Sequence, residues 1–512
     1  MPEFTPLAAL VRDTAQRLPQ KIAIIDPDRA ITYADFDALI DRAAAAMQGA
    51  GLKPQDRISI CALSSIEYAA TFLGSLRAGI AVAPLAPSST PLDFSAMVKD
   101  ADAKILFMDD STMATFASAD IDPAIVRVAL DGGKAGKAFK DWLAPEGSKP
   151  APVTIDPDWV FNIIYSSGTT GTPKGIMHTT WMRWRQYGQL DPLGYGPDAI
   201  TVLSTPLYSN TTLVCFNPTM AGGGTVVLMK KFDARGFLEL CQKHRATHAM
   251  LVPVQYRRIM AIEDFDSFDL SSFVMKFSTS APFSAAIKTD VLKRWPGGLT
   301  EYYGMTEGGG SCVLLAHEHP TKLHTVGQPM PDHEIRLMDD DGNFVAQGEI
   351  GEVVGHSPTI MKGYLNQPGK TAETFWHDAT GKRYVRTGDV GRFDEDGFLT
   401  LMDRKKDMII SGGFNIYPSD IEAAVARHDA VLEVAVVAMP SEEWGETPVA
   451  FVVPRPGASV EASALKTWAN ERLGKFQRIN DVVMVDILPR SAIGKVLKRE
   501  LRDRRLSGDL SA

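Results

Sequence analysis

Helical and strand patterns alternate through the first part of the chain. Apolar residues recur at helical spacing over Tyr33–Met47 and Ile66–Ala78, while Arg57–Ala62 and Ile80–Pro84 are short runs rich in β-formers. Alternation of this kind predicts a mostly parallel sheet covered by helices, which is an α/β fold. The same order continues with a predicted helix at Phe237–His244 and predicted strands at Thr201–Ser204, Thr225–Met229 and Ala249–Val252.

The pattern changes beyond Val326, where shorter strands are separated by Gly, Pro and Asp. These strands are predicted at Glu334–Met338, Gly351–Gly355 and Gly397–Met402, and they indicate a small antiparallel or barrel-like sheet. The charged run Asp403–Asp407 lies between two apolar strands and is typical of a solvated turn.

The C-terminal part of the chain has the pattern of a compact α+β domain. Its predicted helices cover Ser419–Arg427 and Ala462–Leu473, and its predicted strands cover Val431–Met439, Val449–Pro454 and Asp481–Val485. About a hundred residues suffice for an independent domain. We therefore predict an N-terminal domain at residues 1–403 and a C-terminal domain at residues 404–512.

Composition and charge narrow the classes of function. With 512 residues, of which 45% are hydrophobic, the chain can bury more than one core. A net charge of −9 argues against binding to nucleic acid or anionic membranes, because both need a basic face. The sequence has no uninterrupted apolar run of the roughly 18 residues that a membrane helix needs, so we predict no integral membrane segment.

The cysteines indicate a reducing compartment. Cys61, Cys215, Cys241 and Cys312 are scattered and lack the Cys-x-x-Cys spacing of metal and redox sites. The first residues also lack the basic and apolar regions of a secretory leader. We therefore predict a cytoplasmic protein without structural zinc.

The segment Tyr165–Gly175 combines small hydroxyl side chains, glycines and one lysine behind the apolar run Trp159–Ile164. Glycines let backbone amides approach phosphate oxygens, hydroxyls add donors, and lysine adds a compact, mobile charge. Pro173 precedes the lysine and Gly175 follows it, so no helix can begin here as in a Walker loop. We predict a different polyphosphate loop, with the ATP-binding residues Ser166, Ser167, Gly168, Thr169, Thr170, Gly171 and Lys174.

Residues Ser166–Gly175 resemble the signature of the adenylate-forming superfamily, which includes acyl-CoA synthetases, luciferases and the adenylation domains of peptide synthetases. The resemblance extends from Ile31 to Lys495 and rests on several motifs in the same order. It implies a large N-terminal domain with a barrel-like subdomain, followed by a small mobile C-terminal domain. It also implies ATP, Mg²⁺ and coenzyme A as ligands.

A second motif, Tyr302–Glu307, resembles the Tyr-Gly-x-Thr-Glu segment of that superfamily. The aromatic face of Tyr303 can stack on adenine, the Thr306 hydroxyl can donate to a phosphate oxygen, and Glu307 supplies a hard oxygen for Mg²⁺. The resemblance implies that Thr306 and Glu307 are catalytic and that Glu307 binds the metal.

Three residues of the later chain complete the predicted nucleotide site. Tyr384–Asp389 resembles the Arg-Thr-Gly-Asp segment of the family, so we expect the two oxygens of Asp389 to accept from the ribose hydroxyls. Arg404 matches a position that adds a charged fork to ribose or phosphate. Pro489–Lys495 resembles the motif of the catalytic lysine, and Lys495 is expected to bridge the carboxylate and the α-phosphate, which otherwise repel each other.

In the resembling enzymes, the second half-reaction follows a rotation of the small domain. The segment Met408–Pro418 matches the loop that then turns toward the active site, and Lys406 matches the hinge position. The resemblance implies that coenzyme A binds at Ser411, Gly412, Gly413 and Phe414.

The acid pocket departs from the family pattern. Many acyl- and aryl-CoA ligases have histidine where this chain has Ser209, so the carboxylate is oriented by another group or the pocket is deeper. The resemblance places the pocket at Tyr208, Ser209, Thr211, Cys215, Ser280, Ala281, Gly304 and Gly308. None of these is Arg or Lys, which favours a hydrophobic acid with a single carboxylate.

We predict an ATP-dependent carboxylic acid:CoA ligase that acts on an aromatic or medium- to long-chain acid, as a monomer or homodimer. One alternative keeps adenylation but passes the acyl group to a carrier-protein thiol or to an amine. A second alternative is a nucleotide sensor without catalysis, which would bind ATP and release no pyrophosphate. A phosphotransferase is disfavoured because Walker and kinase loops are missing from the sequence.

Overall fold

The computed structural model describes residues 3–166, 173–188, 190, 193–404, 407–411, 414–442, 444–474, 477–490 and 495–510. The chain divides into two units. The first comprises Met1–Leu323, Pro329–Glu334 and Gly355–Val385, and the second comprises His324–Gln328, Ile335–Val354 and Arg386–Ala512. The second unit thus includes strands that precede residue 403, and the domain boundary between residues 403 and 404 stays a prediction.

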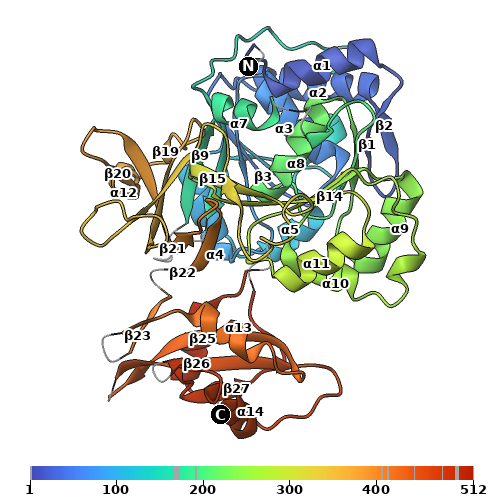
Figure 1. Ribbon diagram of the computed structural model, residues 1–512. Helices are drawn as coiled ribbons and strands as arrows, with labels where there is room; N and C mark the ends of the chain where they lie inside the picture. Colours follow the sequence, from blue (N-terminus) through green and yellow to red (C-terminus); the bar gives the residue numbers. More distant parts are fainter. Residues whose placement is uncertain are drawn as a thin grey trace. The chain divides into compact units, whose positions relative to one another are not determined.

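The first unit contains two sheets (Figure 1). The strands of one sheet are β1 (Ile22–Ile25), β2 (Ala30–Thr32), β10 (Ile200–Leu203), β11 (Thr225–Leu228), β12 (His248–Leu251), β13 (Met275–Ser278), β14 (Gly298–Met305), β15 (Gly308–Leu315) and β16 (Gln328–Pro329). The strands of the other are β3 (Arg57–Cys61), β4 (Ala81–Pro84), β5 (Ile105–Met108), β6 (Val126–Ala129), β7 (Lys137–Ala138), β8 (Val160–Ser166), β9 (Lys174–Thr179) and β19 (Gly363–Tyr364).

Both sheets are parallel in their centres and antiparallel toward an edge. The first runs in the order β16-β15-β14-β13-β12-β10-β11-β1-β2, and its pairs from β14 to β1 are parallel. The second runs in the order β19-β9-β8-β4-β3-β5-β6-β7, and its pairs from β8 to β7 are parallel. The predicted mostly parallel α/β fold is therefore confirmed.

Helices cover these sheets, and the three helices that the sequence predicted for this unit begin and end within three residues of the predicted positions. The longer ones are α1 (Leu7–Arg17), α2 (Tyr33–Gly49), α3 (Ile66–Arg77), α4 (Pro91–Ala101), α7 (Thr180–Tyr187), α8 (Asn210–Ala221), α9 (Ala234–His244), α10 (Pro253–Met260) and α11 (Ala285–Arg294). Helix α2 begins after Thr32 and α3 after Ser65, because each of these side chains accepts a hydrogen bond from a backbone N–H in the first turn.

One continuous hydrophobic core joins α1, α2, α3 and α8 to strands of both sheets. Phe36 on α2 and Phe72 on α3 are fully buried in it, and Phe72 meets Phe161 of β8 edge to face with 5.8 Å between ring centroids. Met182 and Trp184 of α7 are also buried. The two sheets of this unit therefore share one interior.

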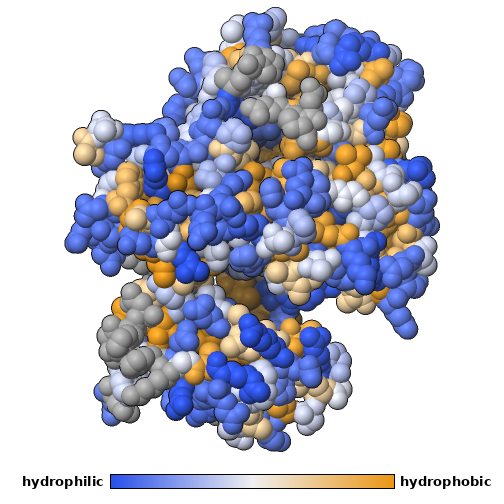
Figure 2. Space-filling model, viewed as in Figure 1, coloured by the Kyte–Doolittle hydropathy of each residue, from blue (hydrophilic) through white to orange (hydrophobic). Residues whose placement is uncertain are grey.

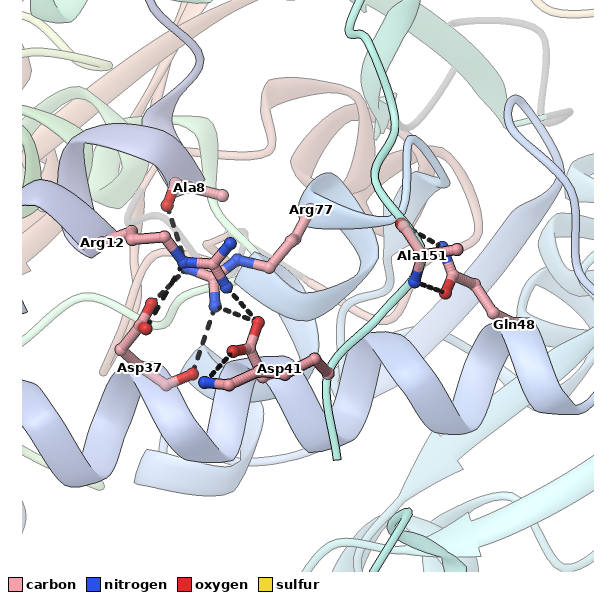
Figure 3. A network of polar contacts seen from close by, with 8 residues as sticks. Ala8, Arg12, Asp37, Asp41, Gln48, Arg77 and Ala151 are labelled. Atoms are coloured by element: carbon pink, nitrogen blue, oxygen red, sulfur yellow. Dashed lines mark hydrogen bonds and ion pairs between the residues drawn. The ribbon is translucent and has the colours of Figure 1, made fainter. Parts of the chain in front are cut away.

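A buried ionic network, which we call the helix lock, joins α1, α2 and α3 (Figure 3). Asp41 on α2 is completely buried and accepts hydrogen bonds from Arg12 on α1, from Arg77 at the end of α3 (2.9 Å) and from Lys149 (2.8 Å). Asp37, one turn before Asp41, accepts from both arginines. Two carboxylates therefore face two arginines within this network.

The second unit contains a small half-barrel and the C-terminal α+β part. Strands β17 (Glu334–Met338), β18 (Ile350–His356) and β21 (Arg383–Phe393) are neighbours, and β22 (Leu399–Arg404) pairs antiparallel with β21. The C-terminal sheet has the order β24 (Phe414–Ile416), β23 (Ile409–Ser411), β26 (Gly445–Pro454) and β25 (Val431–Ser441), and β27 (Asp481–Met484) pairs with β26. Helices α13 (Pro418–Val425) and α14 (Ala462–Asn470) pack on this sheet and α15 (Lys498–Leu506) follows, as the α+β pattern predicts.

Hydrophilic residues occupy most of the visible face of each unit (Figure 2). Within the described residues, no helix has both the length and the apolar character that crossing a bilayer requires.

Candidate active site

The predicted phosphate loop connects two adjacent antiparallel strands. Ser166 at the end of β8 pairs with Lys174 at the start of β9, so these two residues close a hairpin. Ser167, Gly168, Thr169, Thr170 and Gly171 lie outside the described residues, and their role stays a prediction. The hairpin places Ser166 and Lys174, two residues of the predicted phosphate site, beside each other.

Thr306 and Glu307 form the tight turn between β14 and β15, where Met305 pairs with Gly308. Gly308 has a φ of 80°, and a Cβ there would lie 2.1 Å from the carbonyl oxygen of Thr359. Only glycine lets the turn approach this neighbouring segment so closely. This close approach allows a hydrogen bond between the two segments, in which the Met361 N–H donates to the Glu307 carbonyl at 2.9 Å.

Tyr364 joins the turn to the phosphate hairpin. Its hydroxyl donates to Oε1 of Glu307 at 2.9 Å, and Nζ of Lys174 lies 5.2 Å from its ring centroid. Burial, and then the charge of Glu307, raise the pKa of Tyr364, so the phenol stays protonated and remains a donor. One tyrosine therefore holds the predicted phosphate lysine and the predicted metal carboxylate near each other.

The Glu307 carboxylate fits a magnesium site. One of its oxygens is held by Tyr364, and within the described part of the chain no partner occupies the other. The described residues contain no group of three His, Cys, Asp or Glu side chains that could hold a metal. Mg²⁺ commonly uses one or two carboxylates together with waters and substrate phosphates, so a single glutamate beside a phosphate loop suits this ion.

The predicted acid-pocket residues separate into two groups. Oγ1 of Thr211 and Oγ of Ser280 lie 2.7 Å apart, and Ser280 has the left-handed φ of 81° that is rare for a residue with a side chain. Cys215 is fully buried, and its Sγ lies 2.8 Å from the hydroxyl of Tyr195. The structure thus joins Thr211 to Ser280 and places Cys215 against a core tyrosine.

Three further predicted pocket residues lie just before helix α8 or in strand β14. Ser209 precedes the first residue of α8, and Tyr208 is largely buried, which raises the pKa of its phenol. Gly304 pairs with Ser311 across the β14–β15 hairpin, and a Cβ on it would lie 2.8 Å from the Ser311 hydroxyl. Their contact with an acid stays a prediction, as does that of Ala281.

Other predicted site residues belong to the second unit. The Asp389 N–H donates to Oγ1 of Thr387 at 3.0 Å, and the backbone of Asp389 pairs with that of Arg404. Ser411 of β23 pairs with Gly445 of β26. Lys495 directly precedes Val496, which forms a backbone bridge with Arg490. Their roles stay predictions, and Lys406, Gly412, Gly413 and the Phe414 side chain lie outside what the structure describes.

Sequence reasoning missed Tyr364, His178 and Arg183. His178 of β9 contacts the carbonyl oxygen of Thr306 (2.7 Å), and Arg183 of α7 contacts the other nitrogen of His178 (2.7 Å). One signal was present in the sequence, because Arg183 lies inside the apolar run Trp181–Trp184. A charged residue at a core position of a helix is rarely buried without a partner.

Two family models match the chain, the AMP-binding enzyme over residues 11–365 and the AMP-binding enzyme C-terminal domain over residues 420–495. The chain belongs to the AMP-binding enzyme family. The resemblance to adenylate-forming enzymes and the ligase class that follows from it are thereby confirmed.

Three proteins that are similar to this chain are named for three different reactions. The feruloyl-CoA synthase of Amycolatopsis sp is 32% identical over 96% of this chain and 97% of its own length. The fatty acid–[acyl-carrier-protein] ligase ScoC of Streptomyces coeruleorubidus is 30% identical over 98% of this chain and 97% of its own. The amide bond synthetase McbA from Marinactinospora thermotolerans superimposes with a TM-score of 0.87, at 27% identity over 97% of this chain and 99% of McbA.

Proposed function

We propose that this AMP-binding enzyme is an ATP-dependent carboxylic acid:CoA ligase for a hydrophobic monocarboxylic acid, aromatic or of medium to long chain. In the first step a carboxylate oxygen attacks the α-phosphorus of ATP, which forms acyl-AMP and releases pyrophosphate. In the second step the thiol of coenzyme A attacks the acyl carbonyl, and AMP leaves. The observation that carries the proposal is the Tyr364 bridge between Lys174 and Glu307.

The bridge suits adenylation because the two reactants are anions. Lys174 carries a positive charge at the end of the phosphate loop, and Glu307 would hold Mg²⁺, which neutralises phosphate charge when bound. The Thr306 hydroxyl has no partner within the described residues, and it is available to donate to a phosphate oxygen. Two groups for polyphosphate thus contact one tyrosine, and the third, Thr306, precedes Glu307 in the chain.

Lys495 is the proposed cation between carboxylate and α-phosphate. Lys495→Ala is expected to lower acyl-AMP formation roughly 100- to 1,000-fold, which is the scale of losing one preorganised electrostatic group. Thioester formation from supplied acyl-AMP is expected to stay near the wild-type rate. Equal loss in both half-reactions would contradict this role.

The acceptor is tested by replacing coenzyme A. We expect acid, ATP and coenzyme A to give a thioester, and hydroxylamine in place of coenzyme A to give a hydroxamate. Hydroxamate without any thioester would reject coenzyme A. It would favour a carrier thiol or an amine, which are the acceptors that the names of ScoC and McbA indicate for those proteins.

The acid is tested with a panel of carboxylic acids and a pyrophosphate-release assay. The predicted pocket offers the hydroxyl pair of Thr211 and Ser280 and no cationic side chain for a second carboxylate. We expect monocarboxylic acids to exceed their dicarboxylic counterparts by at least about tenfold in kcat/KM, because a second buried carboxylate would stay unpaired. ATP binding without pyrophosphate release for any acid would favour a nucleotide sensor instead.

A further inference from the structure

A chain of buried hydrogen bonds, which we call the Thr306 relay, joins the phosphate hairpin to the turn of Thr306. Arg183 of α7 donates from Nε to Oδ1 of Asn162 on β8 (2.9 Å) and from Nη2 to Nδ1 of His178 on β9 (2.7 Å). Nε2 of His178 then reaches the carbonyl oxygen of Thr306 at 2.7 Å. Both strands that flank the phosphate loop therefore contribute a side chain.

The donors in the relay fix the tautomer of His178. A guanidinium can only donate hydrogen bonds, so Nδ1 of His178 must accept from Arg183. The proton of the neutral imidazole is then on Nε2, where it donates to the Thr306 carbonyl. The donor and the acceptor of each hydrogen bond in the relay are therefore fixed. The relay holds the Thr306–Glu307 peptide with its carbonyl oxygen facing His178.

Burial makes the relay rigid and dry. The side chains of Asn162, His178 and Arg183 are all fully buried. Burial, and then the neighbouring Arg183 charge, hold the pKa of His178 well below its ordinary value, so the ring is neutral at neutral pH. Burial lowers the pKa of Arg183 to about 9, which leaves the guanidinium charged at neutral pH.

The other contacts of the turn leave the ligand-facing groups available. The Glu307 carbonyl accepts from the Met361 N–H, and Oε1 of Glu307 accepts from Tyr364. His178 uses the Thr306 carbonyl, so the Thr306 hydroxyl is not consumed by any of these contacts. The anchors therefore hold the turn without using the Thr306 hydroxyl.

We propose that His178 and Arg183 are positioning residues, which hold the Thr306–Glu307 turn in register with the β8–β9 hairpin, so that Lys174 and the turn contact the same nucleotide during adenylation. The proposal rests on the proposed function, because the nucleotide contacts of Thr306 and Glu307 belong to it. Neither side chain touches the reacting atoms in this role. Their effect is expected in kcat, through the geometry of the transition state.

The test compares three variants of the full chain. His178→Ala removes the anchor, His178→Gln keeps one acceptor and one donor at a similar reach, and His248→Ala is the matched control. His248 is also fully buried and also has contacts at both ring nitrogens, with Thr247 (2.7 Å) and Leu193 (2.9 Å). The readouts are kcat and KM for pyrophosphate release, and amide hydrogen exchange of peptides that cover residues 303–309.

We expect His178→Ala to lower kcat about 10- to 100-fold, because a misplacement of about 1 Å can cost about 100-fold. KM for the acid is expected to change less than about twofold, and exchange at residues 303–309 is expected to quicken. His178→Gln should recover most of the rate. His248→Ala should leave kcat of the folded protein and exchange at residues 303–309 near wild type.

Equal losses of kcat in His178→Ala and His248→Ala would overturn the proposal, as would unchanged exchange at residues 303–309 in His178→Ala. Should His178→Ala fail to fold, His178→Asn tests the same contact, because its shorter side chain does not reach Thr306. If wild-type protein releases no pyrophosphate with any acid, the proposed function fails. The exchange data then decide separately whether the relay anchors the turn.

Discussion

The helix lock and the Thr306 relay each contain a buried charged side chain, Asp41 and Arg183, yet they balance charge in opposite ways. In the helix lock, Asp37 and Asp41 face Arg12 and Arg77 directly. In the relay, Arg183 donates only to neutral acceptors among the residues that the structure describes. A paired buried charge stabilises helix packing, whereas a buried charge without a counter-charge is costly and suits a site that receives a polyanion.

The largest expected effect on stability is that of Asp41→Ala. The change leaves Arg12 and Arg77 facing one carboxylate instead of two inside the first unit. Breaking a buried pair costs about 3 to 5 kcal/mol, and we expect a comparable fall in unfolding free energy. The measurement is a denaturation curve beside kcat per folded molecule. A lost kcat with unchanged stability would place Asp41 in the site instead.

Arg183→Met is expected to lower the rate of catalysis more than the stability of the protein. It removes a buried charge that no described carboxylate pairs, but it leaves the Asn162 oxygen and Nδ1 of His178 without their donor. The two changes offset each other, so we expect a stability change below about 2 kcal/mol. The rate of pyrophosphate release is expected to fall at least about tenfold. A stability loss as large as that of Asp41→Ala would erase the contrast between the two networks.

Acid titration is expected to separate the networks. The pKa of His178 lies well below 6.5 in the folded chain, so below about pH 6.5 only the unfolded chain binds this proton. Stability is then lost as pH falls, by up to about 1.4 kcal/mol per pH unit. His178→Gln should remove this component, which the difference between two denaturation series measures. An identical pH dependence in both proteins would show that His178 is protonated in the folded state.

Asp41 responds in a lower pH range. Burial acts to raise its pKa, but Lys149, Arg77 and Arg12 outweigh burial and hold the pKa below 3.8. The stability that Asp41 contributes is therefore present above pH 3.8 and is lost only as the pH falls below it. Asp41→Asn is expected to reduce the acid sensitivity below pH 4 and to leave the range from pH 7 to 5 unchanged.

The smallest expected effect is that of Lys149→Ala. Its side chain is 70% exposed, although its Nζ donates to Asp41 at 2.8 Å. Solvent screens such a pair, so we expect a loss below about 1 kcal/mol and no change in kcat. A loss of stability near that of Asp41→Ala would mean that Lys149, and not the two arginines, supplies most of the stabilisation in the helix lock.

Much of the fold could be predicted from short stretches of sequence. The spacing of apolar residues identified α2, β3, α3 and β4, because a helix or a half-buried strand repeats its pattern within a few residues. The composition of Ser166–Gly175 and the Thr306–Glu307 motif indicated phosphate chemistry before any contact was known. Their nucleotide contacts themselves stay predictions.

The partners of these motifs could not be predicted in the same way. Tyr364 and Glu307 are 57 positions apart, and His178 and Thr306 are 128 positions apart. Nothing in the pattern around His178 distinguishes it from a solvated histidine at a strand end. The contact arises only when β9 and the β14–β15 turn are brought together by two different sheets.

Local stretches of sequence were enough to predict the α/β character and the membership in an adenylate-forming family, because these depend on local periodicity and on residue types in a fixed order. The packing of distant segments, in contrast, is what links Arg183 to Thr306 through His178, joins Lys174 to Glu307 through Tyr364, and pairs Asp41 with two arginines. Hydrogen bonds act over about 3 Å, so their partners are set by how distant segments pack and not by how the residues follow one another.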